Sequence, residues 1–145
     1  MRRALIDALK TADDERRAAE ELALLTVDES SLRALAAEQP EAALVEALTH
    51  ATETRVQCWL LATLANLALC QPDRQQTVVP ILGGLLASAA PETQQHAALL
   101  AATLSNRSEA ARRTISDEPT VLQSLLALED APDSPAPVGG APLLQ

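Results

Sequence analysis

The side chains that could perform acid–base or nucleophilic chemistry are scattered along this sequence. The two histidines, His50 and His96, lie far apart, and the acidic pairs at 13–14 and 20–21 are typical of solvated helix surfaces. General acid–base catalysis needs titratable groups held beside one another, and a metal site needs clustered ligands. The sequence therefore predicts no enzyme activity, no metal site and no cofactor.

The two cysteines also lack a partner for redox or metal chemistry. Cys58 and Cys70 are not part of a C-x-x-C pair, and they lie twelve positions apart in one predicted helix. That separation is about 18 Å at the helical rise per residue, which no disulfide can bridge. We expect two free thiols in a reducing compartment.

The remaining chemistry is that of binding. Trp59 is the only aromatic residue in the chain, and an exposed indole supplies apolar contact area at a small cost in conformational entropy. Asn66 and Asn106 carry amides, which can donate to and accept from a peptide backbone. These residues need a scaffold that presents them on one surface.

Charge and hydropathy limit the kind of partner. The chain has 20 acidic and 11 basic side chains and a net charge of -9, which disfavours nucleic acid and anionic membranes as ligands. The longest mainly apolar run, 58–70, is too short for a membrane span, which needs roughly 20 residues. No secretory signal is recognisable at the N-terminus. We expect a cytoplasmic protein, with a nuclear location as the alternative.

Composition and repetition predict the scaffold. Ala and Leu dominate, Gly occurs only four times, and the β-branched and aromatic runs of a sheet protein are missing. Segments recur with a period of 39 to 40 residues, which is typical of helical repeat proteins. The segments 5–9, 62–66 and 81–86 return as 44–48, 102–106 and 121–126. The chain is therefore predicted to be all-α.

Helix start and stop signals divide the second copy into three helices. We expect Asp28 to cap a short first helix and Pro40 to open a second one that ends near His50. Thr52 is expected to cap a long third helix that ends near Leu69. The third copy follows the same plan, and a fourth begins before the chain loses its helical pattern.

In the third copy the three helices are expected after Pro72, from Pro80 and from Pro91, and the fourth copy is expected to begin near Asn106. The pair Gly83-Gly84 predicts a close approach between helices. On a helical wheel one stripe of the long helix of copy two forms the core, namely Leu60, Leu61, Leu64, Leu67 and Ala68.

The string Leu64-Ala65-Asn66-Leu67-Ala68, the stretch 71–75 that follows it, and the related stretch 106–110 resemble armadillo repeats. The resemblance covers residues 4 to about 128. It implies a right-handed α-solenoid of about three repeats, in which the third helices line a concave groove and the Asn holds an extended peptide. Importin-like members carry Trp four residues before that Asn, where this chain has Ala62 and Ala102, so capture of nuclear localisation signals is not predicted.

The predicted peptide-binding residues lie opposite the core stripe on the two long helices: Arg55, Trp59, Asn66, Gln95, Leu99 and Asn106. Two structural interpretations stay open beside this one. Trp59 could pack against the neighbouring repeat, and the two Asn side chains could hydrogen-bond the loops between units.

Three functions are compatible with such a solenoid. The first is a non-catalytic protein–protein interaction module that binds an extended peptide or a partner helix in the groove. The alternatives are a co-chaperone or regulatory subunit that cups a folded domain, in which Arg16 and Arg17 would matter more than Trp59, and a fragment of a longer armadillo solenoid.

The last prediction concerns the two ends of the repeat array. Residues 1–129 are predicted to form the repeat domain, and the Pro- and Gly-rich residues 130–145 a disordered tail. Apolar end faces are expected to permit self-association, because solenoids normally need polar caps. The residues expected at these faces are Leu5, Ile6 and Leu9 at one end and Val121, Leu122 and Leu125 at the other.

Overall fold

The computed structural model describes residues 2–9, 12–71, 77–121 and 123–124, and none of these residues forms a strand. The all-α prediction is thereby confirmed. The helices are α1 (Arg2–Ala8), α2 (Ala12–Leu25), α3 (Glu29–Ala37), α4 (Glu41–His50), α5 (Thr54–Cys70), α6 (Val79–Leu86), α7 (Pro91–Arg107) and α8 (Glu109–Ser116). A further helical segment begins at residue 119.

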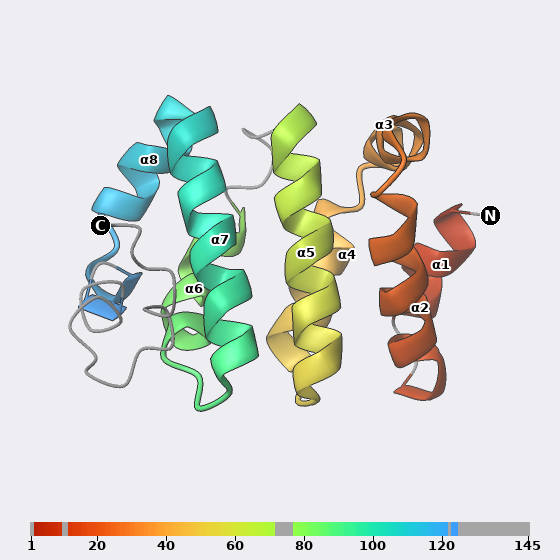
Figure 1. The fold of residues 1–145 in the computed structure, drawn as a ribbon, viewed down its shortest axis with the longest axis horizontal. Helices are drawn as coiled ribbons and strands as arrows, with labels where there is room; N and C mark the ends of the chain where they lie inside the picture. The colour runs from red at the N-terminus through yellow and green to blue at the C-terminus, as the bar shows by residue number, and fades with distance from the viewer. Residues whose placement is uncertain (1, 10–11, 72–76, 122, 125–145) are drawn as a thin grey trace, which may run out of the picture.

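The three longest helices stand side by side as one layer. In Figure 1, α2, α5 and α7 are parallel, and their C-terminal ends lie at the same edge of the molecule. The helices α1, α4 and α6 form a second layer behind them, each in contact with the long helix that follows it in the chain. Each long helix therefore has one side toward the second layer and one side away from it.

Most of the predicted helix boundaries are confirmed. Asp28 caps α3 by accepting a hydrogen bond from the backbone N–H of Ser31 at 2.9 Å, and Pro91 is the first residue of α7. The prediction that Thr52 caps the long helix of copy two is wrong. The N-cap of α5 is Glu53, whose side chain makes no capping hydrogen bond.

The fourth copy is expected to begin near Asn106, and α8 begins three residues later, at Glu109, with Ser108 as its N-cap. The Ser108 hydroxyl accepts a hydrogen bond from the backbone N–H of Ala111 at 3.0 Å. The short helix predicted after Pro72 falls on residues 72–76, and the predicted tail falls on residues 130–145. Both lie outside the described residues.

The core runs through the contact between the two layers. All five residues of the predicted stripe on α5 are buried, and Leu60, Leu64 and Leu67 are completely so. Thr63 and Ala65 are buried as well, which the helical wheel did not predict. Because α5 is flanked by α2 and α7 and backed by α4, it buries more than one stripe. The Thr63 hydroxyl is satisfied by donating to the backbone oxygen of Trp59 at 2.8 Å.

The prediction of an exposed apolar face at the N-terminal end is wrong. Leu5, Ile6 and Leu9 are buried because α1 packs against α2 and α4. At the other end Val121 is buried too, and Leu122 and Leu125 lie outside the residues whose side chains are described. The described apolar residues named for these end faces are therefore part of the core.

The close approach predicted at the glycine pair occurs at Gly83 alone. A Cβ added there would lie 2.8 Å from Oγ1 and 3.0 Å from Cβ of Thr120, whereas a Cβ at Gly84 meets nothing within 4 Å. The hydroxyl of Ser124 also donates to the backbone oxygen of Gly83 at 3.2 Å. Gly83 therefore lets the segment after α8 pack directly on α6.

We expect alanine substitutions at the two glycines to change the free energy of unfolding in opposite directions. Gly84→Ala gains helix propensity in open space and should raise the free energy of unfolding by about 0.5–1 kcal/mol. Gly83→Ala gains the same helix propensity but overpacks against Thr120, and should lower the free energy of unfolding by about 1 kcal/mol overall. Urea unfolding followed by circular dichroism measures both. Equal stabilisation of the two variants would contradict the close approach.

No helix within the described residues is long and apolar enough to cross a membrane.

Candidate functional site

The surface of interest is the side of α2, α5 and α7 that points away from the second layer, which we call the long-helix face. At its centre, on α5, is Trp59, which is partly buried and packs against the core with part of its indole. The exposed Arg55 lies one turn earlier on the same helix, with its guanidinium carbon 5.9 Å from the centroid of the Trp59 ring. This is the spacing of a cation–π contact.

The neighbouring helix α7 contributes a polar and apolar strip beside them. Gln95, Leu99 and Asn106 are exposed on α7, and Leu99 has 57% of its surface accessible. Ala102 lies between Leu99 and Asn106 and is also exposed, so no large side chain interrupts the strip. Because α5 and α7 are in extensive contact, the two strips form one continuous surface.

Asn66 is committed to an internal hydrogen bond. Its Nδ2 donates to Oγ1 of Thr26 at 2.8 Å, and Thr26 in turn donates to the backbone oxygen of Ala23 at 2.7 Å. Thr26 follows α2 and lies one repeat length, 40 residues, before Asn66 in the sequence. This is the alternative left open by the sequence, in which the Asn holds the end of the preceding unit.

Asn106 is in a different situation, although it is the repeat equivalent of Asn66. It is exposed, and its side chain makes no hydrogen bond to a residue that the structure describes. Of the two asparagines predicted to hold a peptide backbone, Asn106 is therefore the one whose amide is not used by another described residue. Asn66 retains only the groups that the bond to Thr26 does not use.

This difference predicts different effects on stability. Asn66→Ala removes the link between α5 and the end of α2, and should lower the free energy of unfolding by about 1 kcal/mol. Asn106→Ala is the matched control, and should change stability by less than about 0.5 kcal/mol. A double-mutant cycle of Asn66→Ala with Thr26→Val measures the bond itself. A coupling energy near zero would show that the bond contributes nothing.

Further polar contacts between units fix the helices of the face relative to one another. Gln57 on α5 accepts a hydrogen bond from Thr93 Oγ1 on α7 at 2.9 Å and donates to the backbone oxygen of Ala51 at 3.0 Å. On the other side Arg16 of α2 approaches Glu53 to 3.8 Å. The Gln57–Thr93 bond links α5 to α7 and the Arg16–Glu53 pair links α2 to the start of α5, whereas the bond to Ala51 stays within one unit.

Both cysteines are free, as the sequence predicts, and both belong to α5. Partial burial raises the pKa of the Cys58 thiol above its ordinary value; a hydrogen bond with Thr93 acts in the opposite direction, and the charge of Glu92 adds to the rise. Cys70, at the end of the helix, is exposed.

Because the thiolate is the reactive form, we expect Cys58 to react slowly. With a disulfide reagent at pH 8, the Cys70→Ser variant, which retains Cys58, should react several-fold more slowly than the Cys58→Ser variant. Raising the pH toward 10 should reduce the difference between the two reaction rates, since it populates the Cys58 thiolate. Equal rates at pH 8 would contradict the described environment of Cys58.

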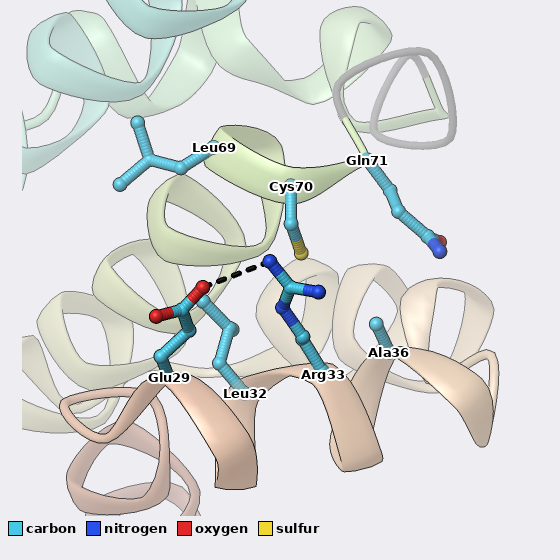
Figure 2. A pocket seen from close by; sticks show the side chains of 7 residues that line it. All are labelled: Glu29, Leu32, Arg33, Ala36, Leu69, Cys70 and Gln71. Atoms are coloured by element: carbon cyan, nitrogen blue, oxygen red, sulfur yellow. Dashed lines mark hydrogen bonds and ion pairs between the residues drawn. The ribbon is translucent and has the colours of Figure 1, made fainter.

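A second feature, which the sequence analysis missed, is an open hollow of about 670 Å³ between α3 and the end of α5. Figure 2 shows the residues that line it: Glu29, Leu32, Arg33, Ala36, Leu69, Cys70 and Gln71. The charged residues among its described lining are Arg33 and Glu29, which are exposed and paired with each other at 2.8 Å. The sequence offered no signal for this hollow, because it depends on how far α3 stands from α5.

The two histidines lie on different helices. His50 lies at the end of α4, and His96 lies on α7 with its Nδ1 2.9 Å from the backbone oxygen of Glu92. In the part of the chain that the structure describes, no three His, Cys, Asp or Glu side chains gather where they could hold a metal ion. What the long-helix face offers is an aromatic ring, a guanidinium, an exposed Leu and a free amide.

Comparison with known proteins extends the description of the fold. No protein-family model matches the chain, and no curated protein matches it. The chain is similar to the crystal structure of an engineered protein from the Northeast Structural Genomics Consortium, with a TM-score of 0.79 and 27% identity over 90% of this chain. The chain spans 56% of that protein's length. The match supports the arrangement of the helices and is silent about function.

Proposed function

We propose that this chain is a non-catalytic protein-binding module built from armadillo-like helical repeats, and that its partner binds on the long-helix face. The observation that carries the proposal is the position of Trp59. The only aromatic side chain of the protein is on the middle long helix, partly exposed, with Arg55 over its ring. An exposed indole that is held rigidly is the kind of residue that dominates binding energy at protein interfaces.

The repeat architecture is supported by the agreement of two observations. The sequence repeats every 39 to 40 residues, and the fold pairs α1 with α2, α4 with α5 and α6 with α7 in two layers. Each pair buries its apolar surface partly against the next pair, which is how solenoids build a continuous core. The alignment of three long helices then produces one broad surface.

The chemistry of the face suits an extended segment or a helix of another protein. Trp59 and Leu99 offer apolar contact area, and the amide of Asn106 can donate to and accept from main-chain groups of a bound segment. Gln95 extends the polar rim on α7. Because Asn66 is held by Thr26, it contributes to the shape of the face more than to hydrogen bonding with a partner.

Capture of binding proteins from native lysate tests the proposal. The bait is either the unmodified chain, a face variant carrying Trp59→Ala, Leu99→Ala and Asn106→Ala, or a control variant carrying Glu46→Ala and Thr49→Ala, two exposed positions on α4. Circular dichroism first establishes that all three are equally helical. Partners that bind the unmodified and control chains but not the face variant are the expected result.

Partners that bind the face variant as well as the unmodified chain would overturn the proposal. If binding is instead lost with Arg16→Glu and Arg17→Glu on α2 and retained with Trp59→Ala, the rim of the face contacts a folded domain, and the regulatory-subunit alternative replaces the peptide-binding one.

A further inference from the structure

The arginine at the centre of the long-helix face is exceptional among the arginines whose side chains the structure describes. Most of these form an ion pair with a nearby carboxylate, in the pairs Arg16–Glu53, Arg17–Asp14, Arg33–Glu29, Arg112–Glu109 and Arg113–Glu109. Arg55 and Arg107 form none with the described residues, and of these two Arg55 alone has a described aromatic ring, that of Trp59, beneath its guanidinium. In a chain with nearly twice as many acids as bases, an unpaired guanidinium at the centre of a face is available to a partner.

The repeat makes the comparison internal to the molecule. The equivalent of Arg55 on α2 is Arg16, which is already paired with Glu53, and the equivalent on α7 is Gln95, which carries no charge. In this row Arg55 is therefore the positive charge that has no carboxylate partner among the described residues. It stands one turn from Trp59, and the exposed Leu99 lies on the adjacent helix.

Stacking on an aromatic ring prepares a guanidinium to bind a carboxylate. The Arg55 guanidinium carbon lies over the ring, 5.9 Å from its centroid, and a guanidinium held over a ring keeps N–H groups with which to form two parallel hydrogen bonds to a carboxylate. The ring also restricts the arginine side chain, which reduces the entropy lost when the pair forms. A carboxylate bound there would place the next residues of the partner against the indole.

We propose that the partner of the long-helix face presents an Asp or Glu side chain to Arg55, with an apolar side chain next to it that packs on Trp59 and Leu99. This inference rests on the proposed function and specifies the chemistry of its ligand. The net charge of -9 repels strongly acidic chains at long range. The fitting segment therefore carries one or two acids among apolar residues and is not an acidic tract.

Selection from a random peptide library displayed on phage tests this chemistry without a known partner. Clones are selected on the full chain and counter-selected on the Trp59→Ala variant, so that only peptides dependent on Trp59 remain. The expected result is enrichment of Asp or Glu directly beside an apolar residue. Clones that depend on Trp59 but show no acidic preference, or that are rich in Lys and Arg, would overturn the inference and leave the proposed function intact. If no clone depends on Trp59, both are overturned.

A synthetic copy of an enriched peptide then locates the acid. Trp59 emission reports binding directly, because the chain has no other aromatic residue. Arg55→Gln should lower the affinity for the acidic peptide about fivefold, which is the effect expected for an exposed ion pair. It should not change the affinity for a copy of the peptide in which the acid is replaced by its amide. Arg33→Gln on α3 removes the same charge away from the face and should leave both affinities unchanged. Equal weakening by the two variants would contradict a contact between Arg55 and the acid.

Discussion

Replacing Trp59 by alanine is expected to weaken binding of the partner about 30-fold, equivalent to about 2 kcal/mol. The indole is the largest apolar group that the long-helix face offers; it packs against the core, and the Arg55 guanidinium lies over its ring. Alanine removes the contact area for the partner and releases Arg55 from its stacked position. Titration calorimetry with a captured partner or a selected peptide measures the change.

The control for this experiment separates binding from folding. Since Trp59 is partly buried, Trp59→Ala also costs some stability, so its helical content and unfolding midpoint are measured first. Trp59→Phe keeps an aromatic ring in the same place and should lose no more than about fivefold in affinity. If Trp59→Ala is folded and binds as tightly as the unmodified chain, the indole is a core residue only, and the interpretation as a binding anchor is wrong.

Leu64→Ala should cause the largest loss of stability of any change considered, about 3 kcal/mol or more. Leu64 is completely buried in α5, the helix that contacts both neighbouring long helices. Truncation leaves a cavity at the junction of three repeat units. With single-domain stabilities of about 5–15 kcal/mol, this loss is visible as a large decrease in the urea midpoint measured by circular dichroism.

Leu99→Ala is the matched control, because it makes the same chemical change at an exposed position on α7. It should alter the free energy of unfolding by no more than about 0.5 kcal/mol. A similar loss for both variants would mean that Leu99 is part of the core. Leu99 would then not belong to the long-helix face.

The course of the helices follows from local signals in the sequence. Asp28, Pro40 and Pro91 mark helix starts through capping or through the fixed proline backbone, and these effects depend only on nearby residues. Thr52 is not the cap because α5 begins at Thr54, so that Glu53 occupies the N-cap position without a capping hydrogen bond. The sequence specifies that a helix begins there more reliably than it specifies the first residue.

The wheel of α5 separated core from surface only in part. It placed Leu64 and its stripe inside and Arg55 outside, because these positions are strongly apolar or charged. It missed the burial of Thr63 and Ala65, since a helix with neighbours on both sides buries surface that an amphipathic pattern leaves unmarked. In the same way Leu5 and Ile6 looked like an exposed end, although α4 and α2 cover them.

The two asparagines show what repetition alone cannot decide. Asn66 and Asn106 have equivalent positions in the sequence, yet only Asn66 finds a hydroxyl from the preceding unit within reach. The residue of the next unit that is equivalent to Thr26 is Asn66 itself. Its amide already donates to the Thr26 hydroxyl, so Asn106 has no equivalent hydroxyl to bind. Differences of this kind depend on one side chain in a neighbouring repeat, so they emerge from the assembled fold.

Site-specific photo-cross-linking tests the central claim most directly. A photoreactive amino acid is placed at Ala102, exposed on α7 between Leu99 and Asn106, or at Glu46, exposed on α4 in the second layer. Each variant is irradiated with the same captured partner. We predict that the partner is cross-linked from position 102 and not from position 46. Cross-links from position 46 alone, or equal yields from both positions, would contradict binding on the long-helix face.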